Sequence, residues 1–213
     1  MKVEKTERCS MREEIEKLAE YTKKAYEKGY VGGSGGNSSV RFGGEVYITP
    51  TGIALDEVMA DTLVRVRLKT GEVLSVNGGK PSKELPMHLA IYQARPDLNA
   101  IIHLHPVDCI AATLLLDEDE LLPCYVPGHV KKIKRPPVEE YFPAGSPELA
   151  VNTMMLFEKN DCVFLKRHGI IAGGKDVRTA YLHCEDMIDA SRIHLWLRGF
   201  GALNEERIQQ LLK

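Results

Sequence analysis

The sequence lacks the features that mark membrane, exported and nucleic-acid-binding proteins. No apolar run approaches the ~20 residues that a bilayer-spanning helix requires. The N-terminal residues Met1 to Thr6 mix acidic and basic side chains with no apolar stretch behind them, so we expect neither a signal peptide nor a transit peptide. The formal net charge of -2, from 28 basic and 30 acidic residues, gives no positive field for a nucleic acid or an anionic membrane.

Cysteine is also scarce, and its spacing excludes two common structural roles. The 5 cysteines include no C-x-x-C pair, which argues against both a disulfide framework and a zinc knuckle. Cys109, Cys162 and Cys184 lie in apolar or helical stretches, where a reduced cysteine packs as a small hydrophobic residue. Reduced thiols predict a cytoplasmic location.

What the sequence does contain is the composition of a folded globular chain. Of its 213 residues, 44% are hydrophobic and 27% are charged, far from the composition of disordered chains. The length allows one large domain or two small ones. Because no linker, repeat or low-complexity tract divides the chain, we expect one domain over residues 1–213.

The hydrophobic periodicity predicts helices that flank a mainly antiparallel sheet in an α/β layered domain. Alternating or short apolar segments predict strands at 38–42, 45–48, 63–68, 72–76, 100–104, 162–165 and 170–172. Helical spacing and capping residues predict helices at 10–29, from 82 or 86 to 94, and at 110–116, 147–158, 177–197 and 204–212. Residues 123–130 are expected to form a loop or a strand.

Two histidines at the end of a predicted strand are candidate metal ligands. His103 and His105 are two residues apart, and strand side chains alternate, so both imidazoles project from one face. Such a pair in isolation is more often structural, with one ring buried on a backbone hydrogen bond. His168, followed by Gly169, ends a second apolar run where side chains could converge on the same pocket. Three imidazoles would leave a coordination position open for a substrate oxygen, as in catalytic zinc sites.

Two segments are candidate anion sites. The glycines before Asn37 offer backbone N–H groups beside an amide side chain, although the spacing is not that of a P-loop and a plain flexible turn fits equally well. Ser82 stands at a predicted helix start, where free N–H groups favour an anion, or else it simply caps the helix. Glu84 is either a first-turn acid or a base that takes a proton from a hydroxyketone near a metal.

Two more side chains have a structural and a functional interpretation. His88 follows Glu84 by one helical turn and could support the site from behind, although a buried structural role is the commoner one. Tyr125 lies in an apolar segment, where packing is the default, but its phenol could donate a proton.

Five short motifs, in this order along the chain, resemble the class II aldolase/adducin family. They are Gly36-Asn37-Ser38-Ser39-Val40-Arg41, Ile48-Thr49-Pro50-Thr51-Gly52, Pro81-Ser82-Lys83-Glu84, His103-Leu104-His105 and Arg167-His168-Gly169. The resemblance extends from about residue 11 to residue 198, and the segment at 92–97 strengthens it. Such an ordered set indicates the family far more specifically than it indicates a substrate.

The resemblance implies a three-layer αβα sandwich with a central, mainly antiparallel sheet, and a homotetramer with active sites at subunit interfaces. It also implies catalytic zinc, which manganese or cobalt could replace. Its implied metal ligands are His103, His105, His168 and Glu84, with Glu84 becoming the acid/base when substrate displaces it. Its implied phosphate-binding residues are Gly36, Asn37, Thr51, Gly52, Ser82 and Lys83. Tyr125 matches a tyrosine that donates a proton to the aldehyde from the neighbouring subunit.

The family also implies a reaction, a retro-aldol cleavage through a zinc-stabilised enediolate. A phosphorylated ketose similar to fuculose 1-phosphate would give dihydroxyacetone phosphate and an aldehyde. Decarboxylation of 3-oxo-tetronate 4-phosphate makes the same electronic demand, and it is favoured by Lys83, where the aldolases have a second serine, and by residues 144–147. Tyr125 favours the aldolase, although no tyrosine follows Tyr181 to match the one in the aldolases' C-terminal tail. Epimerases, dehydratases and a non-catalytic adducin-like interaction module remain alternatives.

Overall fold

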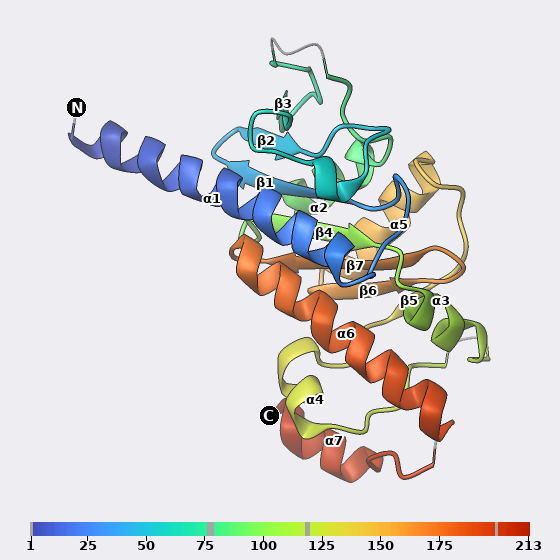
Figure 1. Ribbon diagram of the computed structural model, residues 1–213. Helices are drawn as coiled ribbons and strands as arrows, with labels where there is room; N and C mark the ends of the chain where they lie inside the picture. The colour runs from blue at the N-terminus through green and yellow to red at the C-terminus, as the bar shows by residue number, and fades with distance from the viewer. Residues whose placement is uncertain (1, 76–78, 118–119, 199) are drawn as a thin grey trace.

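A mixed sheet forms the centre of the computed structural model, which describes residues 2–75, 79–117, 120–198 and 200–213, with side chains from residue 11 onward (Figure 1). In this part of the chain the sheet has 7 strands in the order β3-β2-β1-β4-β7-β6-β5. All neighbouring described strands pair antiparallel except β5 and β6, which run parallel. The strands are β1 (Asn37–Phe42), β2 (Glu45–Ile48), β3 (Val64–Arg67), β4 (Ala100–Leu104), β5 (Val138–Glu139), β6 (Cys162–Leu165) and β7 (Gly169–Gly174).

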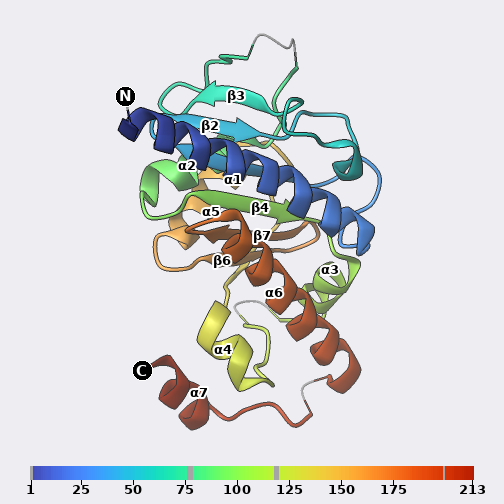
Figure 2. The same cartoon turned by 60° about the vertical axis from the view of Figure 1, so that its left-hand side comes forward.

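Helices cover both faces of this sheet. One face lies under α1 (Lys2–Glu27) and α6 (Val177–Leu197), and the other under α2 (Leu85–Ala94) and α5 (Pro147–Phe157) (Figures 1 and 2). The remaining helical segments are η1 (Leu55–Glu57) beside α1, α3 (Val107–Leu114) beside α6, and the pair α4 (Pro127–Ile133) and α7 (Glu205–Leu212). The three-layer αβα sandwich is confirmed. Within the described ranges, no helix combines the length and apolar character needed to cross a bilayer.

Strand alternation divides the core into two layers. Along β4, Ala100, Ile102 and Leu104 pack into the layer under α1 and α6. Ile101 packs into the layer under α2 and α5. Because successive side chains of a strand point to opposite faces, His103 shares the α2 face with Ile101.

Three expected elements differ in kind or in extent from the structure, and the helix expected at 110–116 instead spans Val107–Leu114. The first helix begins at Lys2 rather than at residue 10, because the preceding lysines and glutamates are good helix formers without a breaker among them. Residues 127–133 form helix α4 rather than a loop or strand, since Pro127 suits a first helical turn and lysines suit the last. The strand expected at 72–76 is reduced to a bridge between Val66 and Val73, and Val76 lies outside the described residues.

Candidate metal centre

The topology of the sheet explains how distant histidines meet. β4 and β7 are antiparallel neighbours, with His103 opposite Ile171, so the end of β4 lies beside the start of β7. His168 precedes β7 in a turn where Arg167 has φ 63°. His105 follows the end of β4, and Glu84 occupies the position before the first turn of α2.

Four side chains from these three places converge. Glu84, His103, His105 and His168 each present one ligand atom, and these atoms all lie within 4.8 Å of one another. Glu84 Oε2 is 3.0 Å from His103 Nε2, and Glu84 Oε1 is 3.4 Å from His168 Nε2. His105 Nε2 is 2.8 Å from His103 Nε2. The structure therefore brings together the whole expected ligand set.

The contacts of His103 favour a positive charge at the centre of this cluster. His103 Nδ1 donates to the carbonyl oxygen of Ile170 at 2.8 Å, so a neutral ring points its Nε2 lone pair at the Glu84 carboxylate. That arrangement is unfavourable unless a proton or a metal ion lies between the two groups. Burial lowers the pKa of His103, yet Glu84 raises it above its ordinary value. Three nitrogens and one carboxylate match the ligand preferences of zinc.

The other ligands are in the protonation states that a metal requires. Burial, with His103 adding to it, lowers the pKa of His105 to about 3 and that of His168 to about 4, so both rings are neutral at pH 7. Burial raises the pKa of Glu84, but His103 and His168 together with the Asn37 hydrogen bond hold it well below its usual range. Among the residues that the structure describes, the buried Glu84 Oε1 has no hydrogen-bond partner, as expected of an oxygen that binds a metal ion.

Glycines allow the backbone to approach these rings closely. A Cβ atom on Gly169 would lie 2.2 Å from the Leu104 carbonyl oxygen, and one on Gly35 would lie 2.7 Å from His105 Nδ1. Gly36 has φ 70°, a conformation that residues with a Cβ rarely adopt. A larger residue at any of these positions would shift the strand or a ring.

The expected phosphate-binding residues lie on segments that are bonded to one another beside this cluster. Thr51 N donates to the Lys80 carbonyl oxygen at 3.0 Å, and Ser82 N donates to the Thr49 carbonyl oxygen at 3.1 Å. Asn37 Nδ2 donates to Glu84 Oε2 at 2.8 Å. The Gly36–Asn37 turn, Thr51–Gly52 and Ser82–Lys83 are therefore neighbours, and the Lys83 side chain is exposed.

Tyr125 lies in a different part of the chain. It stands just before α4, where its hydroxyl is 3.1 Å from His194 Nδ1 of α6. This region extends beyond the sheet (Figures 1 and 2). The contribution of Tyr125 to a neighbouring subunit's cluster stays a prediction. His194 had no signal in the sequence that could have marked it as the partner of Tyr125.

Comparison with known proteins fits this arrangement. A family model described as the class II aldolase and adducin N-terminal domain matches residues 16–195. The chain belongs to the class II aldolase and adducin family. This membership confirms the resemblance seen in the five motifs and indicates a lyase.

Two relatives of this class II aldolase-family chain have different activities. An L-fuculose phosphate aldolase of Methanococcus maripaludis is 38% identical over 169 residues, which cover 79% of this chain and 89% of the relative. A 3-oxo-tetronate 4-phosphate decarboxylase of Pectobacterium atrosepticum is 33% identical over 171 residues, covering 79% and 77%. A solved L-fuculose 1-phosphate aldolase superposes with a TM-score of 0.84 at 31% identity, covering 94% of each chain.

Proposed function

We propose that this protein is a divalent-metal lyase that cleaves a phosphorylated ketose similar to fuculose 1-phosphate into dihydroxyacetone phosphate and an aldehyde. The observation that carries the proposal is the convergence of three imidazole Nε2 atoms and the Glu84 carboxylate within 4.8 Å. The aldolase relative at 38% identity supports the substrate class.

The cluster would hold a zinc ion through His103, His105, His168 and Glu84, and manganese or cobalt could replace it. When bound, the ion supplies positive charge that offsets the negative charge developing on the substrate oxygens, a contribution of several kcal/mol. His103 is preset for this role because Ile170 fixes its ring through Nδ1, which leaves Nε2 directed at the centre.

Glu84 and Tyr125 would move the protons. In the direction of bond formation, Glu84 accepts a proton from the carbon beside the ketone carbonyl of dihydroxyacetone phosphate. The partner subunit's Tyr125 donates a proton to the aldehyde oxygen as the new carbon–carbon bond forms. Cleavage is the reverse of these steps. Glu84 can accept this proton because it is charged at neutral pH and because, among the described residues, its Oε1 has no hydrogen-bond partner. The partner's contribution requires an assembly, which we propose to be a homotetramer with sites at its interfaces.

The phosphate would bind on the side of the cluster formed by the bonded turns. Gly36 and Gly52 have φ 70° and 83°, conformations that help successive backbone N–H groups to face one anion. The Ser82 hydroxyl adds a further donor, since its Oγ only accepts from Glu84 N at 3.2 Å, and exposed Lys83 adds a positive charge. The proposed binding residues are Gly36, Asn37, Thr51, Gly52, Ser82 and Lys83.

Decarboxylation of 3-oxo-tetronate 4-phosphate is the second candidate, and one contact favours it. A Cβ atom on Gly145, which has φ 75°, would lie 3.0 Å from the Lys83 carbonyl oxygen, so the 144–147 segment adjoins Lys83. In this reaction the bond to the carboxylate breaks, carbon dioxide leaves, and its electron pair moves toward the ketone oxygen. The carbon then takes up a proton from water, which Glu84 would pass on to it. The decarboxylase relative at 33% identity supports this alternative.

Metal analysis of the purified protein separates both enzymes from a non-catalytic interaction module. We expect about one equivalent of zinc per chain, because three imidazoles and a carboxylate are already assembled. Less than about a tenth of an equivalent, in fully folded protein supplied with zinc, would favour the interaction module.

A substrate panel separates the two enzymes. Dihydroxyacetone phosphate would be measured from ketose 1-phosphates and from 3-oxo-tetronate 4-phosphate, with carbon dioxide followed in parallel. In the active reaction, Glu84→Gln should lower turnover by a factor of roughly 10²–10⁴ while phosphate ligands still bind. Glu140→Gln is the matched control, since Glu140 is exposed and pairs with Lys166. Parent-like turnover of Glu84→Gln would remove Glu84 from the mechanism.

A further inference from the structure

A column of buried polar side chains runs from Glu84 along the interface between α2 and β1. Four helical residues rise about 6 Å, and two strand residues rise about 6.6–6.8 Å, so the two series stay level over several steps. Every second residue of β1 therefore meets every fourth residue of the α2 segment. Asn37, Ser39 and Arg41 face Glu84, His88 and Tyr92 in this way.

The carboxylate fixes the direction of each hydrogen bond in this column. Because a charged Glu84 can only accept, Asn37 Nδ2 donates to it at 2.8 Å, and Asn37 Oδ1 must accept from the next group. That group is His88 Nε2, at 2.6 Å, so Nε2 carries the proton. The Nδ1 of a neutral ring then accepts from Ser39 Oγ at 2.7 Å. Each donor in the series points toward Glu84.

The column continues to Tyr92 without access to solvent. The Tyr92 hydroxyl lies 2.9 Å from Ser39 Oγ and donates to the Ser39 carbonyl oxygen at 3.0 Å. Asn37, Ser39, His88 and Tyr92 are all 0–3% exposed. Since water cannot replace a lost partner there, reversing one amide or one ring would leave buried donors and acceptors unsatisfied.

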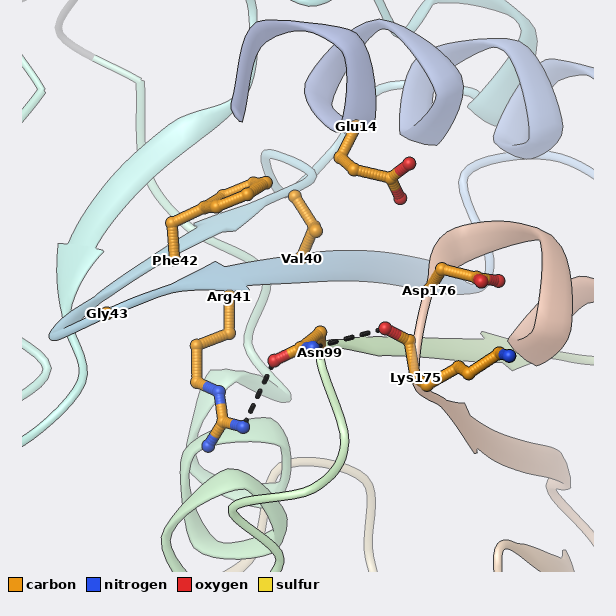
Figure 3. A pocket seen from close by; sticks show the side chains of 8 residues that line it. All are labelled: Glu14, Val40, Arg41, Phe42, Gly43, Asn99, Lys175 and Asp176. Carbon is orange, nitrogen blue, oxygen red and sulfur yellow. Dashed lines mark hydrogen bonds between the residues drawn. The ribbon is translucent and has the colours of Figure 1, made fainter. Parts of the chain in front are cut away.

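Arg41 lies at the other end of the column, near the C-terminal end of β1. Its guanidinium donates to the Tyr92 carbonyl oxygen at 3.0 Å and to Asn99 Oδ1 at 3.2 Å, and it lies 5.3 Å from the Tyr92 ring centroid. Figure 3 shows Arg41 on the other side of β1 from Val40 and Phe42, and all three side chains line one cleft. The column is thus held at both ends, by a charged donor and by a charged acceptor.

We propose that His88 is a positioning residue for Glu84, because it holds the Asn37 amide in the one orientation that donates to the carboxylate. Asn37 and Glu84 then stay fixed while Glu84 faces His103 and His168. The inference rests on the proposed function, in which these side chains bind a metal. A packing role alone would require only a side chain of similar size, whereas the directed bonds require an N–H group at the place of Nε2.

Two amide substitutions distinguish these roles. In His88→Gln the side-chain amide N–H group lies about where Nε2 was, within reach of Asn37. In His88→Asn the amide extends only about as far as Nδ1, near Ser39. Both replace a buried ring with an amide, so both should destabilise the protein. His183→Gln and His183→Asn are matched controls on α6, where His183 Nδ1 bonds to the Gly173 carbonyl oxygen at 2.9 Å.

The main measurement is the affinity for Zn²⁺ alone, by competition with a chromophoric chelator. We expect His88→Asn to weaken zinc binding about 10–100-fold, as loss of a group that orients a metal ligand commonly does. His88→Gln should stay within about threefold of the parent, and so should both His183 variants. Parent-like zinc affinity in His88→Asn, with a lowered melting temperature, would show that His88 only packs and would overturn the proposal.

A second measurement keeps the inference separate from the proposed function. In the metal-free protein, the two side-chain amide protons of Asn37 should give distinct, protected NMR signals in the parent and in His88→Gln. His88→Asn should average or shift them. If the folded parent binds no zinc, the proposed function fails, while these signals still decide whether His88 orients Asn37. Identical Asn37 signals in both variants would contradict the positioning role.

Discussion

The two faces of the sheet are packed with different chemistry. Under α1 and α6 the buried side chains are mainly apolar, among them Cys184, Met187 and Ile188. Under α2 the layer also buries His88 and its hydrogen-bonded neighbours. Apolar packing depends on volume, whereas a polar column depends on the direction of every bond. We therefore expect substitutions under α6 to change stability and substitutions beside α2 to change the metal cluster.

The largest expected loss of stability is under α6. Met187 is fully buried there, so Met187→Ala should lower the free energy of unfolding by about 2–5 kcal/mol. Zinc affinity should remain that of the parent, because the cavity lies on the other face of the sheet from His103. Urea unfolding and chelator competition measure the two quantities. A parallel loss of zinc affinity would mean that the faces are coupled.

A smaller loss of stability, together with weaker metal binding, is expected at the start of β7, beside the end of β4. Gly169→Ala places a Cβ atom 2.2 Å from the Leu104 carbonyl oxygen. Leu104 is the residue between His103 and His105. We expect about 1–3 kcal/mol of destabilisation and weaker zinc binding, because the strand must shift. Gly44→Ala is the control, since no heavy atom lies within 4 Å of its added Cβ. Parent-like zinc affinity in Gly169→Ala would show that the strand shifts without the rings.

The smallest expected effect concerns an isolated acid on the α5 side. Burial raises the pKa of Glu139 to about 7, although the Thr153 hydroxyl donates to it at 2.6 Å. Above its unfolded pKa the unfolded chain releases a proton that the folded chain keeps, so Glu139 costs stability increasingly as pH rises to about 7.

Glu139→Gln removes this charge and keeps an oxygen for Thr153. The variant should gain stability relative to the parent as pH rises from 4.5 to 8, by an amount on the order of 1 kcal/mol, or roughly 2–4 °C in melting temperature. The buried amide changes the stability difference by the same amount at every pH, so the pH-dependent part reports the charge of Glu139 alone. Glu140→Gln, at an exposed neighbour, should show no such pH dependence. A constant difference between Glu139→Gln and the parent would contradict the raised pKa.

The sequence predicted elements whose signals are local. The strands at 100–104 and 162–165 and the helix at 177–197 match the structure, because each is a uniform run with a marked end, such as the Asp176 cap of α6. β5 was missed since it has only 2 residues, and its pairing with β6 depends on contacts distant along the chain. Helix α4 was missed because its proline and glycine suggest a turn.

The candidate site also has parts that local sequence patterns predict and parts that depend on contacts distant along the chain. The pairing of His103 with His105 follows from strand alternation, which any single segment reveals. Bringing His168 to them depends on the pairing of β4 with β7, which no local pattern fixes. The end of a second apolar run marked His168 as a candidate, and the family resemblance implied it as a ligand. The column through His88 depends on how α2 packs against β1, which aligns every fourth helical residue with every second strand residue. Its only trace in the sequence is polar residues at spacings of four and two.

The cysteines under α6 make separation of that layer measurable by thiol labelling. Cys109, Cys162 and Cys184 are buried, and burial raises their thiol pKa, to about 12 for Cys109. Alkylating reagents attack the thiolate and need access to it, so these positions can react only when the helix lifts from the strands. Cys124 is only partly buried and should be modified earlier. The delay between modification of Cys124 and modification of the three buried cysteines therefore reports how slowly α6 separates from the sheet.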